Sequence, residues 1–492
     1  MRSDEPLMEA TTLLGVIAAA LLGVFLTIKF PKSFVFAAVW FIMLEDSIQW
    51  LFKIEWITYT DEVVTALAAL IFPLGRLMSK RRLVRIPGMG WIVLFVFAGG
   101  IGNALNATPA EVFALGAGSA LKGLVFAFAV AQLDWTPRDI QRSAKYFFLI
   151  GTALVVTGAI NLVAPGPWAQ VFSPSGNLDY RFGIPSLIGP FVHPGIYATV
   201  LGLISVAALS YRRTVRKSRA SAFLAFTTAV GSLLGMRRRL WASAAMAWAG
   251  LLARTSTRAT AVLVTVLAVP VGILVSGDFF SSIFGSISRE YLSETGQASA
   301  ARTVLSLGAV DVANLAIPFG AGFGRYASWV AALRYSPEYV ARGFDHIWGL
   351  TPLERGSSNF LLDTFWPAVI GETGWLGLFA FVGLVLSIIR MFYKLSAKTE
   401  SRALARCVGV TGFGWMLFIL FDSVAGPSFY NPLYMILYAI IGVGSHLYFT
   451  KPVPTAAVAD DLDGSAAEKA PNDGEPATEP SGPGRAMVRR GR

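Results

Sequence analysis

The chain has 492 residues, of which 54% are hydrophobic and only 14% are charged, and its formal net charge is +11. This composition excludes an ordinary soluble enzyme and indicates a polytopic membrane protein. The basic residues stand mainly in short connectors between apolar stretches, which is typical of topology signals and argues against nucleic-acid binding.

About thirteen apolar runs come near the roughly 20 residues that a helix needs to cross a bilayer. They cover about 8–28, 33–52, 60–78, 89–107, 110–133, 144–165, 191–211, 218–236, 240–253, 259–276, 366–393, 406–424 and 431–449. We therefore expect an all-α polytopic integral membrane protein with about 12–13 transmembrane helices. The first run lacks a basic stretch and a cleavage site, so it is expected to be a retained helix.

Lysine and arginine collect in three connectors, around residues 80–85, 212–219 and 394–406. If these connectors face the cytoplasm, the runs between them are mutually consistent and the segment 277–365 falls on the outer face of the membrane. Residues 1–449 then form one transmembrane domain. Residues 450–492 are rich in Ala, Pro, Gly, Asp and Glu, which predicts a disordered cytoplasmic tail in preference to a binding arm.

The segment 277–365 is the one long stretch between apolar runs that is too polar for lipid. It contains no lysine, but it contains Arg289, Arg302, Arg325, Arg334, Arg342 and Arg355, together with His346. Guanidinium groups bind phosphate and carboxylate in a bidentate way, so the arginines suggest an anion site on this loop. A merely solvated loop is the alternative.

Three consecutive arginines, Arg237, Arg238 and Arg239, fall at an outer helix boundary, where topology signals should be scarce. Binding of an anionic lipid head group or of a lipid-linked pyrophosphate would explain them. The alternative is that 218–253 is a kinked pair with a cytoplasmic hairpin.

The stretch from Arg181 to Gly195 combines an arginine, several backbone breakers and His193 just before an apolar run. Pro194 fits the first turn of a helix, whose positive end would then point to the outer site and favour an anion. Lys122 lies in the middle of the fifth run, so we expect it to face the interior, where it contacts the lipid phosphate or pairs with Glu45 or Asp46.

In this order, the motifs resemble the O-antigen ligase and polymerase superfamily of membrane glycosyltransferases over roughly 181–390. The resemblance rests on the Gly189-Pro-Phe-Val-His193-Pro194 segment and on Arg-Arg-Leu-Trp241, which is similar to a Ser-Arg-x-x-Trp pattern. It rests also on a loop frame of Arg302, Pro318-x-Gly-x-Gly-x-Gly324 and Glu372-x-Gly374-x-x-Gly377. This chain has Gly195 where the family often has Asn, and Ser358-Asn359 where it often has His-Asn.

The resemblance implies an enzyme of the bacterial cytoplasmic (inner) membrane, acting outside the cytoplasm in cell-surface polysaccharide synthesis. Its donor would be a glycan on undecaprenyl pyrophosphate and its acceptor a glycan or lipid-glycan. We expect a metal-independent glycosyltransferase with no cofactor, of either the polymerase or the ligase type. A flippase or transporter of lipid-linked sugars is the alternative function.

Arginines would stabilise the pyrophosphate leaving group, and a base would activate the acceptor hydroxyl. The expected catalytic residues are Arg302, Arg238 and His346, the last as a substitute for the missing family histidine. The expected substrate-binding residues are Arg181, His193, Arg237, Arg239, Arg325, Lys122 and Glu372.

Overall fold

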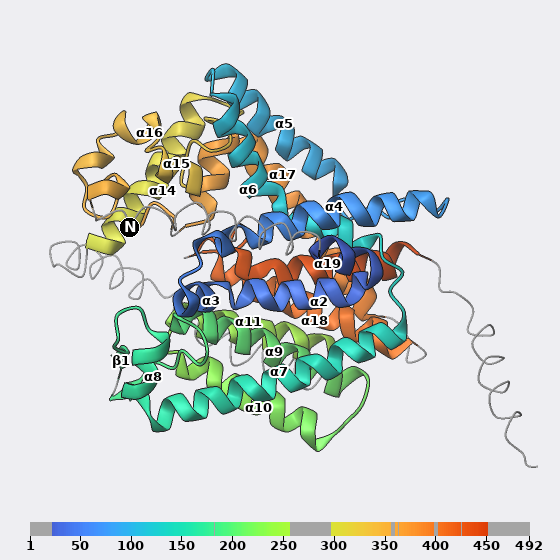
Figure 1. The fold of residues 1–492 in the computed structure, drawn as a ribbon. Helices are drawn as coiled ribbons and strands as arrows, with labels where there is room; N and C mark the ends of the chain where they lie inside the picture. Colours follow the sequence, from blue (N-terminus) through green and yellow to red (C-terminus); the bar gives the residue numbers. More distant parts are fainter. Residues whose placement is uncertain are drawn as a thin grey trace, which may run out of the picture. The chain divides into compact units, whose positions relative to one another are not determined.

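The computed structural model describes residues 22–255, 297–355, 360–397 and 402–450, apart from residues 182, 363 and 425. The predicted run at 259–276, most of the run at 8–28, Arg289 and the tail beyond residue 450 lie outside the described residues. The described chain consists mainly of α-helices, with one small antiparallel sheet (Figure 1).

The first ten labelled helices are α2 (Pro31–Met43), α3 (Glu45–Phe52), α4 (Thr60–Met78), α5 (Met89–Leu105), α6 (Ala110–Ala131), α7 (Pro137–Val163), α8 (Pro165–Phe172), α9 (Pro194–Thr214), α10 (Arg219–Leu234) and α11 (Arg238–Thr255). The later ones are α14 (Gln297–Leu315), α15 (Trp329–Leu333), α16 (Pro337–Val340), α17 (Trp366–Ser396), α18 (Ala403–Asp422) and α19 (Met435–Phe449). Short 3-10 helices cover Glu55–Tyr59, Phe344–His346, Leu353–Arg355 and Pro432–Tyr434. Strands β1 (Tyr180–Arg181) and β2 (Ile184–Pro185) form a hairpin in which Arg181 pairs with Ile184.

Seven helices of the described chain are long and apolar enough to cross a membrane: Trp56–Met78, α6, α7, α9, α17, α18 and Pro432–Phe449. Helices α2 and α3 make an eighth candidate, which is bent by 61°. Helices α5 and α10 are apolar but shorter, and α11 has 18 residues but carries arginines at both ends. The prediction of an all-α polytopic membrane protein is confirmed, whereas fewer of the predicted runs pass as spans in this part of the chain.

The bend between α2 and α3 lies at Leu44, and Glu45 and Asp46 occupy the first turn of α3. Carboxylates at that position favour a helix start, because they interact with its positive end. The run that the sequence placed at 33–52 is therefore interrupted where its two acidic residues stand.

The structure corrects the expected partners of Lys122. Helices α4 and α6 pack together, and the ammonium group of Lys122 pairs with the Asp61 carboxylate and lies 3.0 Å from Oε1 of Glu62. The expected ion pairs with Glu45 and Asp46 are not the ones formed. Charges inside a membrane commonly pair with one another, and Lys122 is held in this way between two helices.

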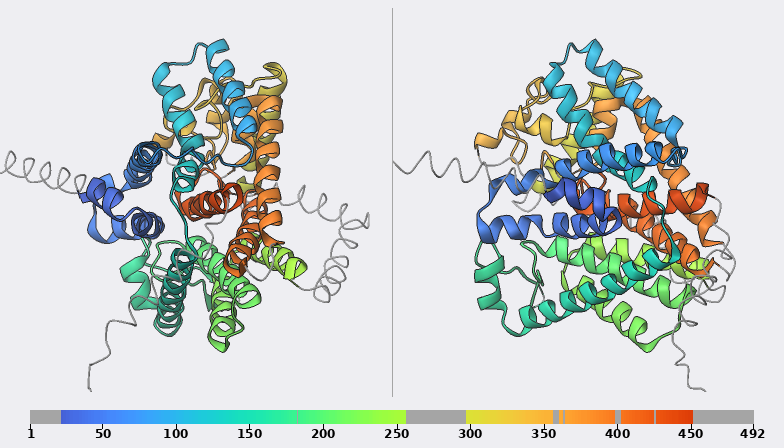
Figure 2. Two further views of the ribbon diagram at one scale, coloured as in Figure 1. Left: turned by 90° about the vertical axis from the view of Figure 1, so that its right-hand side faces the viewer. Right: turned by 45° about the vertical axis from the view of Figure 1, so that its right-hand side comes forward.

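Contacts between helix ends divide the described bundle into two ends. At one, which we call the loop end, α9, α11 and α17 begin while α10 and α18 finish. The backbone N–H of Leu187 donates to the Leu234 carbonyl at 3.0 Å, and Nε1 of Trp366 donates to Oγ of Ser423 at 3.1 Å. Figures 1 and 2 show α9 and α11 (green) beside α18 (orange).

The opposite end, which we call the basic end, carries the described residues of the basic connectors, at 80–85, 212–219, 394–397 and 402–406. Nε of Arg254, in the last turn of α11, donates to Oγ of Ser396 at the end of α17 over 2.9 Å. The guanidinium group of Arg85 lies 5.6 Å from the ring centre of Phe449, the last residue of α19. The basic connectors that the positive-inside rule places on one side of the membrane thus lie at one end of the folded helices.

Helix α9 is the most enclosed of the candidate spans, with 72% of its apolar window buried. The indole Nε1 of Trp415 donates to the Leu203 carbonyl at 2.8 Å, and Nε1 of Trp248 donates to Oγ of Ser205 at 3.0 Å. These hydrogen bonds from α18 and α11 satisfy polar groups inside the apolar packing. These hydrogen bonds also fix how far α9 extends along the bundle relative to α11 and α18, and so the position of His193 at its start.

The described part of the loop, 297–355, is folded and not merely solvated. Tyr326, Tyr339 and Phe344 are buried in a cluster of their own, and the rings of Tyr339 and Phe344 stack with centroids 5.7 Å apart. Helix α14 packs against α17. The loop therefore has a fixed surface on which side chains can be positioned.

Candidate anion-binding site

Helix α9 begins at Pro194 as the sequence predicted, and the side chain of His193 caps it. Its Nδ1 accepts a hydrogen bond from the backbone N–H of Gly195 at 3.0 Å, and Pro194 occupies the first helical position. A side chain at position 195 would place its Cβ 2.9 Å from Nδ1 of His193, so glycine here avoids a close contact with the ring.

Arg237 lies beside the His193 ring, in the turn between α10 and α11. Its Nη2 is 3.0 Å from Oδ2 of Asp179 and 3.4 Å from Nε2 of His193. Arg181, on the β1–β2 hairpin, is close enough for its charge to lower the pKa of Arg237, although burial is the larger cause and Asp179 opposes both. Nε of Arg237 is buried and has no hydrogen-bond partner.

Arg239 completes this group from the first turn of α11. Its Nε lies 3.3 Å from Oδ1 of Asp422, the last residue of α18. Asp422 is 2% exposed, and its other oxygen accepts hydrogen bonds from Oγ of Ser428 at 2.7 Å and from the hydroxyl of Tyr434. Because two hydroxyls hold the carboxylate, the Asp422 ion pair fixes the position of the Arg239 guanidinium group, whose charge also acts on His193.

Burial and the positive charges of Arg237 and Arg239 lower the pKa of His193 to about 4. The residue keeps an exposed edge, so we expect solvent to reduce the shift without changing its direction. The ring is therefore neutral near pH 7. Because Nδ1 accepts from Gly195, the proton of the neutral ring belongs on Nε2.

Two N–H donors then face each other, on Nε2 of His193 and on Nη2 of Arg237. Neither can accept from the other, and an oxygen placed between the two nitrogens, which are 3.4 Å apart, would accept from both. Together with the partnerless Nε of Arg237 and the positive end of α9, this arrangement is suited to an anion with several oxygens. We call Arg181, His193, Arg237 and Arg239 the arginine cluster.

The loop contributes Arg302, which extends from α14. Its guanidinium carbon lies 4.8 Å from the ring centre of Phe360, within the range of a cation–π contact. The ring centre of Phe360 lies 5.5 Å from that of Trp348, and the backbone N–H of Phe360 donates to the Gly349 carbonyl. Arg302 is thus positioned by aromatic rings.

Other predicted loop arginines have acidic partners within the fold. Arg325 and Arg342 both pair with Glu338 at 2.9 Å, and Arg334 pairs with Glu111 of α6. Only 14% of the Arg325 side chain is exposed. These contacts favour a role for Arg325 in holding the loop together, in place of the expected contact with substrate.

Glu372 is likewise placed within the scaffold. It is 1% exposed, and its Oε1 accepts from the backbone N–H groups of Gly324 at 2.8 Å and Tyr326 at 3.3 Å. Helix α17 breaks two residues later at Gly374, whose φ of +64° suits glycine. The carboxylate therefore ties the glycine-rich turn to the start of α17, which favours a positioning role.

His346 stands in the 3-10 helix Phe344–His346. Its side chain is 82% exposed, and Nε2 lies 3.4 Å from Oδ2 of Asp345. In the part of the chain that the structure describes, no recorded contact joins His346 to Arg302 or to the arginine cluster. The side chain of Arg238 lies outside the described residues, as does that of Arg355.

The loop and the arginine cluster meet through the end of α18. Trp366, the first residue after the loop, binds Ser423, while the adjacent Asp422 binds Arg239. Phe365 packs against Tyr430 with ring centres 4.9 Å apart. The two sets of arginines therefore belong to the same end of the bundle.

Sequence reasoning missed Asp179 and Asp422, which orient Arg237 and Arg239. Asp422 carried a usable signal, because it is the sole acidic residue of α18 and stands at its last position. Among the described residues, no group of three metal-ligating side chains could hold a metal ion.

Comparison of the sequence with protein-family models and with curated proteins finds no match. The chemistry of the site is therefore argued from its own residues.

Proposed function

We propose that this protein is a membrane glycosyltransferase of the polymerase or ligase type, which transfers a glycan from undecaprenyl pyrophosphate to an acceptor glycan or lipid-glycan. The single observation that carries the proposal is the pair of donors on Arg237 and His193, which lie 3.4 Å apart and share no acceptor within the described residues. A pyrophosphate is an anion of the kind that such donors bind.

In the proposed reaction, an acceptor hydroxyl attacks the anomeric carbon of the donor glycan. The new C–O bond forms as the bond to the pyrophosphate oxygen breaks, and undecaprenyl pyrophosphate leaves with the bonding electrons. Arg237, Arg239 and the N–H of His193 stabilise the charge that develops on that oxygen. Arg181 adds positive charge beside Arg237.

The acceptor proton needs a base, and His346 with Asp345 is the His–carboxylate pair on the loop that suits this role. Arg302, held over Phe360, would orient the sugar or its phosphate from the loop side. We further propose that the loop end faces away from the cytoplasm, because the basic connectors gather at the opposite end.

The test is to supply purified protein in lipid vesicles with an undecaprenyl-pyrophosphate-linked oligosaccharide. A polymerase yields a ladder of longer lipid-linked glycans, and a ligase yields a single transfer to a lipid-glycan acceptor. Both release undecaprenyl pyrophosphate. Intact donor after incubation with each acceptor would contradict the proposal.

A second function, transport of lipid-linked sugars, is favoured by two specific observations. The bent pair α2–α3 and the embedded charges of Lys122, Asp61 and Glu62 are features that transporters share. Movement of a labelled donor across the vesicle bilayer without bond cleavage would support this alternative, whereas release of undecaprenyl pyrophosphate supports transfer.

A further inference from the structure

A cavity with a volume of about 620 Å³ lies in the basic half of the bundle, away from the arginine cluster. Its walls come from α2, α7, α9, α10, α18 and α19 and are mostly apolar, with Phe36, Phe147 and Trp415 among them. The volume falls within the roughly 300–1,000 Å³ of typical ligand sites. Nothing in the proposed transfer reaction uses it.

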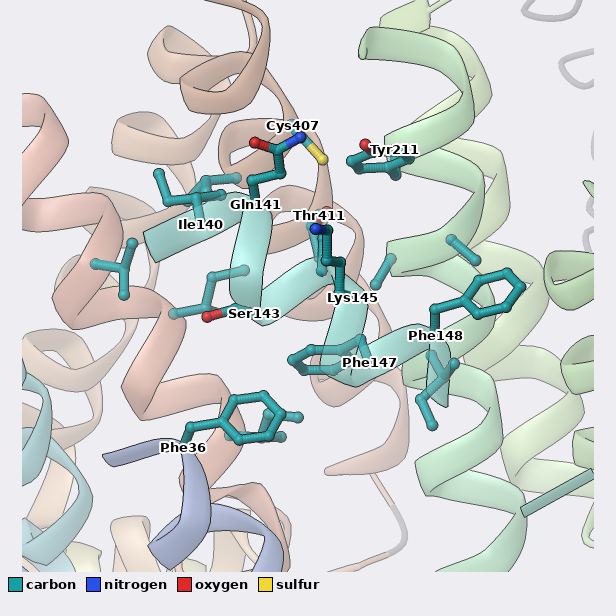
Figure 3. A pocket seen from close by; sticks show the side chains of 18 of the residues that line it. Phe36, Ile140, Gln141, Ser143, Lys145, Phe147, Phe148, Tyr211, Cys407 and Thr411 are labelled. Atoms are coloured by element: carbon teal, nitrogen blue, oxygen red, sulfur yellow. The ribbon is translucent and has the colours of Figure 1, made fainter. Parts of the chain in front are cut away.

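The two ends of this cavity differ in chemistry. Figure 3 shows Lys145 and Gln141 pointing toward the end where Tyr211 and Cys407 lie, whereas Phe36 and Phe148 lie at the other end. Arg216, from the connector after α9, also lines the cavity. A positively charged mouth therefore leads into an apolar interior.

Lys145 and Arg216 are exposed, and the described part of the chain gives neither of them an acidic partner. Lys145 stands two turns into α7, within a candidate span, where an uncompensated charge is costly unless it reaches a polar group or an anion. The basic residues of the arginine cluster, by comparison, have Asp179 and Asp422.

We propose that the cavity binds an anionic phospholipid of the bilayer, with one acyl chain among the apolar side chains and the head-group phosphate at Lys145 and Arg216. Basic pockets between membrane helices bind anionic head groups in this way, and the apolar walls exclude a free phosphate as sole occupant. The site is distinct from the proposed donor site, which lies at the loop end.

The test is native mass spectrometry of the whole protein, released from nanodiscs that hold palmitoyl-oleoyl phosphatidylglycerol and palmitoyl-oleoyl phosphatidylcholine in equal amounts. The wild-type protein should retain phosphatidylglycerol. The double variant Lys145→Ala/Arg216→Ala should lose roughly tenfold or more of that retention, since each basic residue contributes about a fivefold gain in binding to an anionic lipid.

The matched control is Arg142→Ala/Lys217→Ala, which removes the same charges from the same two segments at exposed residues that do not line the cavity. The control should retain the lipid as the wild type does. An equal loss in the control, or equal retention of both lipids by the wild type, would overturn the proposal.

The acyl chain is tested separately by Ala207→Trp, which fills the apolar part of the cavity and keeps both charges. This variant should also lose phosphatidylglycerol, and retention would mean that the chain lies elsewhere. Should the bulky side chain prevent folding, the charge variants still decide, because their substitutions are at exposed positions. None of these outcomes depends on glycosyl transfer.

Discussion

Nη2 of Arg237 lies 3.4 Å from Nε2 of His193, although the hydrogen bond from Gly195 to Nδ1 makes both atoms donors. A contact between two donors is stable only when an acceptor is shared between them or when the charges are balanced nearby. Asp179 balances the charge of Arg237 on one side. An anion with several oxygens would accept from both donors, and the proposed site rests on this relationship.

The pKa of His193 should report on the occupancy of the site. Without ligand it should lie below the ordinary value of 6.5, because the ring is partly desolvated and two guanidinium charges act on it. Binding of inorganic pyrophosphate should raise it, because an anion favours the charged ring. Histidine-selective NMR measures this readily, since the chain has 3 histidines and His193→Asn identifies the signal. A pKa that pyrophosphate leaves unchanged would place the anion elsewhere.

The same shift sets a pH dependence of stability. Between the lowered folded pKa of His193 and the unfolded value of 6.5, the unfolded chain binds the extra proton, so the free energy of unfolding should fall as the pH drops through this window. Arg237→Ala should weaken the dependence by removing one of the charges that lower the pKa. Thermal unfolding of both proteins at several pH values checks this, and an equal slope in the two would count against it.

Glu372 should act on the fold more than on the chemistry. Glu372→Ala leaves the buried N–H groups of Gly324 and Tyr326 without their acceptor, which costs roughly 1–3 kcal/mol for each group. Glu372→Gln keeps an oxygen at that position and should lose less stability. Thermal unfolding in detergent compares the two. A stable but inactive Glu372→Gln would instead indicate contact with the substrate.

Two glycines of α6 offer a matched pair. A Cβ at Gly116 would come 2.4 Å from the backbone nitrogen of Gly324, so Gly116→Ala should push the glycine-rich turn away and destabilise the protein by roughly 1–3 kcal/mol. Gly118 has open space around it, and Gly118→Ala should be neutral or stabilising by about 0.5–1 kcal/mol. Unfolding midpoints measure both, and similar midpoints would show that the turn does not pack on α6.

The ion pair between Lys122 and Asp61 should be destabilising to break from one side only, as is usual for buried charges. Lys122→Met leaves the 1% exposed Asp61 carboxylate uncompensated, at a cost of about 3–5 kcal/mol. Adding Asp61→Asn should restore most of the stability. The two variants are compared by thermal unfolding. If the double variant is less stable than the single one, the pair is not what holds α4 against α6.

The sequence was sufficient to predict the helical membrane architecture, the start of α9 at Pro194 and the grouping of the basic connectors, because these depend on local patterns. It failed where distant segments meet. The side-chain amide of Asn103 donates to the Phe323 carbonyl at 2.9 Å and accepts from the Phe323 N–H at 2.7 Å. The two residues are 220 positions apart, and nothing in the sequence near either one indicates these hydrogen bonds. The acidic partners of Lys122, Arg237 and Arg325 were missed for the same reason.

The contacts of the predicted site residues likewise depend on how distant segments pack. Arg302 and Arg325 look equivalent as loop arginines in the sequence, but Glu338 engages Arg325 and a ring of Phe360 lies under Arg302. Periodicity and composition contain no information about which group each of two such charges contacts in the fold. The bend at Leu44 lies where Glu45 and Asp46 interrupt the apolar run, and such charges are visible in the local sequence.

The most direct test of the central claim is the rate at which undecaprenyl pyrophosphate is released from the lipid-linked donor by Arg237→Ala. Arg213→Ala, an exposed arginine at the basic end, serves as the matched control. If Arg237 stabilises the leaving group, kcat should fall by roughly 10²–10³-fold in Arg237→Ala, with an unchanged unfolding midpoint, and stay near the wild-type value in Arg213→Ala. Equal release rates in the two variants would contradict the account.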